Sequence, residues 1–141
     1  MPRIAGDPTI ARPPQGPYSA SARVGSIIGI AGQCGFVSDG TLADGLEAQI
    51  RAGMDNLVLA LRASGVTPDD VVSVQVYLTD AEHFGTMNKI YAEYFDPPYP
   101  ARTTVYVGLR GGALFEVNAI AAVTPEPRAT RESPELPGLV V

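Results

Sequence analysis

The stretch LFEVNAIAAV, residues 114–123, alternates between two kinds of side chain with the period of a β-strand. One set is apolar throughout and consists of Phe115, Val117, Ala119 and Ala121. This set predicts a face that packs against helices. The other set places Glu116 and Asn118 on the opposite face, pointing away from the helical layer.

Two segments upstream have the apolar periodicity of amphipathic helices. Residues 42–64 form the longer one, and Gly65 follows it as a residue suited to a left-handed C-terminal cap. The second covers residues 79–95, where Thr79 and Glu82 have the spacing of a capping box. Both helices are therefore expected on the apolar side of the sheet.

The remaining strands are predicted from alternation and turn residues, at 18–22, 26–35, 71–78 and 101–107. The first two are expected to form a hairpin, and glycines within the second suggest a bulge or a close approach of another backbone. In the third, the predicted core face consists of Val72, Val74, Val76 and Leu78. The short connection GLRGGA before residue 114 would allow the last two strands to pair as a hairpin.

This order of elements predicts one α+β domain over residues 1–123, in two layers. The sheet is expected to be mixed and mostly antiparallel, with both helices on one face. Residues 1–16 form an irregular lead-in, and residues 124–141 form a proline-rich tail that is extended or mobile. The bare face of the sheet needs a cover, for which another copy of the chain is the default.

Composition excludes several classes of function. The net charge of −5 and the single lysine disfavour nucleic-acid binding. No apolar run is long enough for a signal sequence or a membrane span, so no membrane partner and a cytoplasmic location are expected. One cysteine (Cys34) and one histidine (His83) cannot build a zinc site, and no metal is expected. His83 is expected on a solvated helix turn.

One polar group could perform chemistry. Alternation places Arg102 and Thr104 on one face of their strand. If the last two strands pair as a hairpin, both residues lie near Asn118 and Glu116 on the same side of the sheet. Without further information, a buried ion pair between Arg102 and Glu116 that stabilises the oligomer is the more common explanation of such a pattern.

Five motifs then occur in order between residues 12 and 123. They are Gly16-Pro17-Tyr18, Gly32-Gln33, Asn88-x-x-Tyr91 with Tyr94-Phe95, Pro100-Ala101-Arg102, and Glu116-Val117-x-Ala119-Ile120-Ala121. Each is weak alone, but together the sequence resembles the YjgF/Rid (reactive intermediate deaminase) family. The resemblance implies a chorismate-mutase-like fold and a homotrimer. Its sheets would line a central barrel, with three clefts between adjacent chains.

The resemblance also implies an activity, the hydrolysis of 2-aminoacrylate-like enamines and imines to 2-keto acids and ammonia without a cofactor. Arg102 would bind the substrate carboxylate, and Glu116 would position or activate water. Substrate-binding positions would be Tyr18, Ala31, Gly32, Thr104 and Asn118. Ala31, Thr104 and Asn118 differ from residues common in the family (serine, cysteine and glutamate), which leaves the substrate open.

Other residues of these motifs have simpler interpretations. Asn88 and Tyr91 are expected to be structural, and Tyr18 could equally be interface packing. On a regular strand Cys34 faces away from Ala31, which favours a buried structural thiol over a nucleophile.

The sequence leaves three alternative functions open. One is a pathway-specific deaminase, resembling 2-aminomuconate deaminase or a tailoring enzyme of secondary metabolism. Another is a non-catalytic trimer that binds small carboxylates. The third, chorismate mutase activity, must hold a dicarboxylate, for which Arg102 is the one evident clamp.

Overall fold

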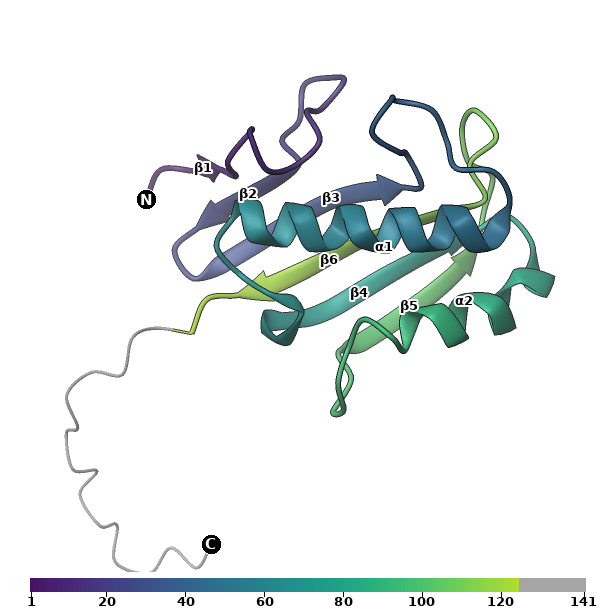
Figure 1. Ribbon diagram of the computed structural model, residues 1–141. Helices are drawn as coiled ribbons and strands as arrows, with labels where there is room; N and C mark the ends of the chain where they lie inside the picture. Colours follow the sequence, from purple (N-terminus) through teal and green to yellow (C-terminus); the bar gives the residue numbers. More distant parts are fainter. Residues whose placement is uncertain (125–141) are drawn as a thin grey trace, which may run out of the picture.

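The computed structural model describes residues 1–124, so the predicted tail lies almost wholly outside the described residues. Six strands form one mixed sheet in the order β1-β2-β3-β6-β4-β5 (Figure 1). The strands are β1 (Ile4–Ala5), β2 (Ser21–Val24), β3 (Ile27–Cys34), β4 (Val71–Leu78), β5 (Ala101–Tyr106) and β6 (Phe115–Ala122). The helices are α1 (Leu46–Ala63) and α2 (Phe84–Tyr91), with 3-10 turns at Pro68–Asp70 and Ala81–His83.

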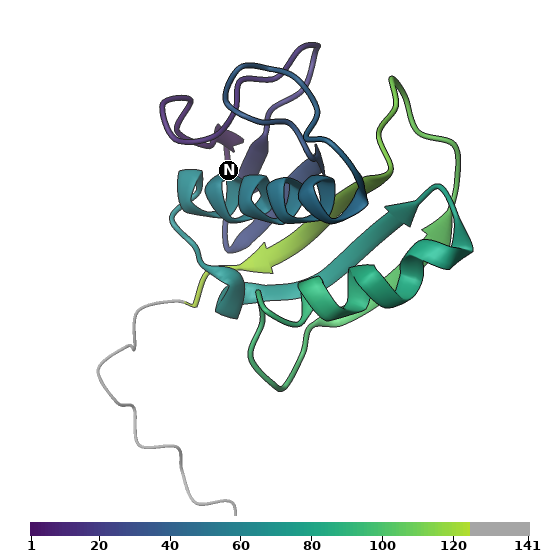
Figure 2. The ribbon, with the colours of Figure 1, turned by 45° about the vertical axis from the view of Figure 1, so that its right-hand side comes forward.

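Both helices lie on the same face of the sheet, which confirms the two-layer α+β prediction (Figures 1 and 2). α1 runs across β3 and β6, and α2 lies over the β4–β5 side of the sheet (Figure 2). The apolar set predicted on β6 is buried against this layer, with Phe115 and Val117 wholly inaccessible. The core therefore sits between the sheet and the helices, and the other face of the sheet is open.

The predicted hairpin between the last two strands is wrong. β6 lies between β3 and β4 and is antiparallel to both, whereas β5 runs parallel to β4 at the edge of the sheet. β4 thus separates β5 from β6. The glycine-rich segment between β5 and β6 passes the end of β4 instead of making a tight turn.

Two irregularities change which residues face the core. On β4 a register shift lies between Val71 and Ser73. Val71 is buried, whereas Val72, predicted to face the core, is 56% exposed. On β3 the predicted bulge is confirmed, because the register shifts between Ile30 and Gln33.

The ends of several elements differ from their prediction. The lead-in contains the short strand β1, which pairs with β2. α1 begins at Leu46, four residues later than predicted. Asp80, not Thr79, caps the next segment, because its side chain accepts a hydrogen bond from Glu82 N. α2 ends at Tyr91, short of the predicted residue 95.

Within residues 1–124, neither helix is long and apolar enough to span a bilayer.

Candidate functional site

Arg102 lies on the edge strand β5, and its side chain turns toward α2. It is in register with Val74, whose side chain is buried on the helical side of the sheet. The guanidinium carbon lies 4.7 Å from the ring centre of Tyr91 and 5.7 Å from that of Phe84. These cation–π contacts hold the cation in place at the edge of the sheet without neutralising it.

The polar groups around Arg102 lack partners. Among the described residues no carboxylate lies within 4 Å of its guanidinium. Its Nη1 makes one weak contact, 3.9 Å from Met87 Sδ. Buried oxygens of Asn88 (Oδ1) and Tyr91 (OH), and of Thr104 (Oγ1) two residues further along β5, make no hydrogen bond. Asn88, Tyr91 and Arg102 share a cavity of about 430 Å³ with Tyr99 and Pro100. Unpartnered buried polar atoms are rare in native proteins, so this cavity has the features of a ligand site.

Burial raises the pKa of Tyr91 to about 12, against a smaller opposing effect of Arg102. The phenol is therefore neutral at ordinary pH and can donate a hydrogen bond beside the guanidinium. Tyr91 and Asn88 were expected to be structural, and the Tyr91 ring does belong to the hydrophobic core, but Tyr91 OH and Asn88 Oδ1 have no hydrogen-bond partner. Their i, i+3 spacing on α2, which puts both side chains on one helical face, was the available signal.

Glu116 lies on the open face of the sheet, as predicted. Its carboxylate Oε1 accepts a hydrogen bond from Cys34 Sγ at 3.3 Å. Gly32 makes room for it, since a β-carbon there would stand 2.9 Å from the Glu116 carboxyl carbon. Gly32, Cys34 and Glu116 line a cavity of about 300 Å³ together with Tyr18, which is 55% exposed.

The bulge in β3 explains the position of Cys34. On a regular strand it would face away from Ala31, but the register shift brings it to the Glu116 side. Burial, followed by the charge of Glu116, raises the pKa of the Cys34 thiol to about 12. A thiol so protonated acts as a hydrogen-bond donor to Glu116. The expected orientation of Cys34, away from Ala31, is wrong because of the bulge, and its structural role stays a prediction.

Ala31 and Asn118 line a different hollow on the open face, which they share with Tyr18. Asn118 Nδ2 donates to Gln75 Oε1 at 3.2 Å, and its own Oδ1 is buried without a partner. The predicted residues therefore fall into groups. Thr104 accompanies Arg102, Gly32 accompanies Glu116, and Tyr18 lies between the cavities of Glu116 and Asn118.

The expectation that Arg102 and Glu116 share one side of the sheet in a single chain is wrong. Arg102 aligns with Val74 on the helical side, whereas Glu116 aligns with Tyr77 on the open side. The cause is the parallel pairing of β5 with β4 in place of the hairpin. An Arg102–Glu116 ion pair within one chain is excluded as well. A site that uses both residues needs two copies of the chain.

The chain matches known proteins over most of its length. The protein family described as Endoribonuclease L-PSP matches residues 9–123. A RutC family protein of Pyrococcus horikoshii is 40% identical over 111 residues, covering 77% of this chain and 88% of that protein. The 2-iminobutanoate/2-iminopropanoate deaminase of Mus musculus is 38% identical over 113 residues, covering 78% and 84%.

The fold also matches that of solved structures. The crystal structure of RidA from the Antarctic bacterium Psychrobacter superposes with a TM-score of 0.81 at 31% identity. The alignment covers 85% of this chain and 99% of that one.

Proposed function

The chain belongs to the YjgF/Rid family, described as Endoribonuclease L-PSP, and from this premise we propose that it is an imine deaminase. It would hydrolyse enamines and imines of the 2-aminoacrylate type to 2-keto acids and ammonia. The mouse relative is named for that reaction on 2-iminobutanoate and 2-iminopropanoate. Cleavage of RNA, which the family description suggests, is opposed by the net charge of −5.

The observation that supports this most strongly is the environment of Arg102. A half-buried guanidinium with no carboxylate beside it in residues 1–124, in a cavity shared with the unpartnered oxygens of Asn88 and Tyr91, suits a small carboxylate ligand. Its planar fork binds a carboxylate through two parallel hydrogen bonds. Tyr91 OH can donate a third hydrogen bond to the same group. The substrate would thereby be fixed in one orientation.

The second requirement is water at the C=N carbon, and Glu116 can supply it. An enamine first tautomerises to the imine. The Glu116 carboxylate accepts a proton from water as its oxygen bonds to the imine carbon. That proton passes to the nitrogen and gives a carbinolamine. Its hydroxyl proton then moves by way of Glu116 to the amino nitrogen, the C–N bond breaks as the C=O bond forms, and ammonia leaves the new 2-keto acid. Holding water about 3 Å from the carbon gives the proximity advantage.

We propose that the two halves meet between copies of the chain, in the clefts of a trimer. Arg102 lies on an edge strand, available to a neighbour, and Glu116 faces the open side of the sheet. That side exposes apolar residues, among them Ile27 at 62% and Ile120 at 49%. Apolar surface of this kind favours burial against another subunit. The three open faces would then line a central barrel.

An assay with a reactive substrate tests the proposal. A dehydratase generates 2-aminoacrylate in situ, and the appearance of keto acid is followed with and without the protein. We expect acceleration by the wild type, a rate near the uncatalysed one for Arg102→Ala, and a reduced rate for Glu116→Gln. Arg62→Ala, which removes an exposed arginine at the end of α1, is the control for net charge.

The outcomes separate the alternatives. The non-catalytic binder would be favoured if the protein accelerates the hydrolysis of no simple imine but binds carboxylates in a way that depends on Arg102. Acceleration that is equal in wild type and Arg102→Ala would contradict the proposed clamp. A deaminase dedicated to one pathway would accelerate one imine well and 2-aminoacrylate poorly.

A further inference from the structure

The cavity of Glu116 contains two cations that the proposed mechanism does not use. Arg12 enters it from the lead-in, and Arg110 enters from the turn after β5. Glu116 is the one carboxylate in its lining. With two guanidinium groups against one carboxylate, the cavity favours a ligand with a negative charge beyond the carboxylate held by Arg102.

Arg12 is held in place more firmly than a surface arginine. Its guanidinium carbon lies 4.2 Å from the ring centre of Phe36. The loop that carries Phe36 is itself fixed, because Asn56 Nδ2 donates to the carbonyl oxygens of both Cys34 and Phe36. The cation is therefore preorganised, which lowers the entropy lost when it binds an anion.

No acidic side chain of residues 1–124 neutralises Arg12. Two carboxylates are near it in the fold, but each has other donors. Asp39 accepts hydrogen bonds from Thr41 N at 2.9 Å and Thr41 Oγ1 at 2.6 Å. Asp55 accepts one from Tyr94 OH at 2.7 Å. The guanidinium of Arg12 thus keeps its hydrogen-bonding capacity for a ligand.

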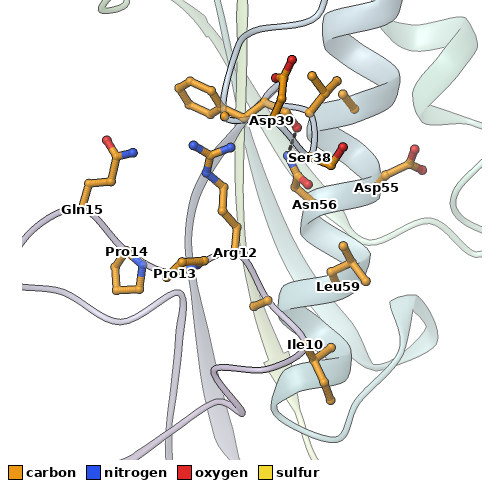
Figure 3. A pocket seen from close by; sticks show the side chains of 15 residues that line it. Ile10, Arg12, Pro13, Pro14, Gln15, Ser38, Asp39, Asp55, Asn56 and Leu59 are labelled. Carbon is orange, nitrogen blue, oxygen red and sulfur yellow. Dashed lines mark hydrogen bonds between the residues drawn. The ribbon is translucent and has the colours of Figure 1, made fainter.

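Arg12 also joins the Glu116 cavity to a larger one of about 710 Å³ between the lead-in and α1 (Figure 3). In Figure 3 its side chain extends from the lead-in toward the loop that carries Ser38 and Asp39. Phe36 and Asn56 line both cavities as well. The larger cavity is lined by Ile10, Val37 and Leu59 together with the carboxylates of Asp39 and Asp55.

We propose that Arg12 is a specificity residue for imines that carry a second carboxylate at the end of the side chain. This rests on the proposed function. The first carboxylate would be held by Arg102 of one copy, and the C=N group would lie beside Glu116 of the other. The side chain would extend along the wall of the Glu116 cavity, and its terminal carboxylate would bind Arg12.

A matched pair of imines tests the inference. An amino-acid oxidase converts glutamate to 2-iminoglutarate and norvaline to 2-iminopentanoate, which has the same chain length without the second carboxylate. We expect the wild type to have the higher kcat/KM for 2-iminoglutarate. Arg12→Gln lowers the ratio of the two kcat/KM values about tenfold, mainly through KM, because it removes one charged hydrogen-bonding partner. Arg62→Gln, the control, keeps the wild-type ratio.

An unchanged ratio in Arg12→Gln, or a wild-type preference for 2-iminopentanoate, overturns the inference. A binding measurement separates this failure from failure of the proposed function. Calorimetry compares glutarate with pentanoate as ligands of the wild type and Arg12→Gln. If no imine is hydrolysed but an Arg12-dependent preference for glutarate remains, the binding site stands and the deaminase does not. If both imines are hydrolysed with equal kcat/KM, the deaminase activity stands and the inference about Arg12 does not.

Discussion

At the scale of single residues, Cys34 shows how a bulge changes chemistry. It lies against Glu116, and burial together with that charge raises its pKa to about 12. A raised pKa favours the neutral thiol, so the thiolate is scarce at neutral pH and becomes abundant only as the pH approaches 12. The thiolate, which is the form that reacts with alkylating reagents, is therefore suppressed in the folded chain.

Alkylation kinetics test this directly, since Cys34 is the only cysteine of the chain. With iodoacetamide at pH 8 we expect the folded protein to react at least about a hundredfold more slowly than glutathione, because the thiolate fraction falls about tenfold per unit of pKa. Denatured protein serves as the control and should react at an ordinary rate. Rapid modification of the native protein at pH 8 would contradict the environment described for this thiol.

The direction in which Glu116 points could be predicted from the sequence, but the residues that surround Arg102 could not. Alternation predicted that Glu116 points away from the helices, because the period of a strand is fixed. The grouping of Arg102 with Asn88 and Tyr91 depends on how α2 packs over β5, which periodicity does not specify. Arg12 was missed for a related reason. It lies in a segment without periodicity, and only the fold brings it to Phe36.

At the scale of elements, the packing of α1 on the sheet depends on one glycine. A β-carbon at Gly53 would stand 2.7 Å from a ring carbon of Phe115, which is fully buried. Gly85 on α2, by contrast, has nothing within 4 Å of the same position. The two glycines form a matched pair for separating the intrinsic helix propensity from close packing.

Chemical unfolding of two alanine variants tests this packing. Gly85→Ala should stabilise the protein by up to about 1 kcal/mol, the difference in helix propensity. Gly53→Ala makes the same gain but overpacks the core at a cost of about 1–3 kcal/mol, so a net destabilisation is expected. Equal stabilisation by both substitutions would mean that α1 can move away from β6 without cost.

Elements were easier to predict than their order in the sheet. Both α-helices and four of the strands were found from periodicity with errors at the ends, whereas β2 shares only Ser21 and Ala22 with the strand predicted at 18–22. The position of β4 between β5 and β6 was not found, because a short glycine-rich connection suits both a hairpin and a passage across one strand end. That one pairing decides whether Arg102 and Glu116 share a face.

At the scale of the whole molecule, the opposite faces of Arg102 and Glu116 lead to a prediction about mixtures. Arg102→Ala and Glu116→Gln should each lack most activity alone. When the two variants are unfolded together and refolded at equal amounts, each cleft draws its two halves at random, so about a quarter of the clefts regain both groups. The measurement is the rate of imine hydrolysis before and after mixing.

Two controls make the mixture interpretable. Wild type carried through the same unfolding and refolding gives the recovery of the procedure. Sedimentation should report a trimer for the wild type and for the mixture. Mixed trimers that remain inactive would contradict a cleft shared between copies, whatever the activity of the wild type.

The central place of β6 has a consequence for biosynthesis. β6 is the last strand of the described chain, yet it joins the β1-β2-β3 half of the sheet to the β4-β5 half. A nascent polypeptide on the ribosome therefore holds two partial sheets whose facing edges stay unpaired until residues 115–122 emerge. Unpaired edges invite aggregation. Closure of the sheet should consequently wait for the emergence of β6, and chaperones would be needed most just before that moment.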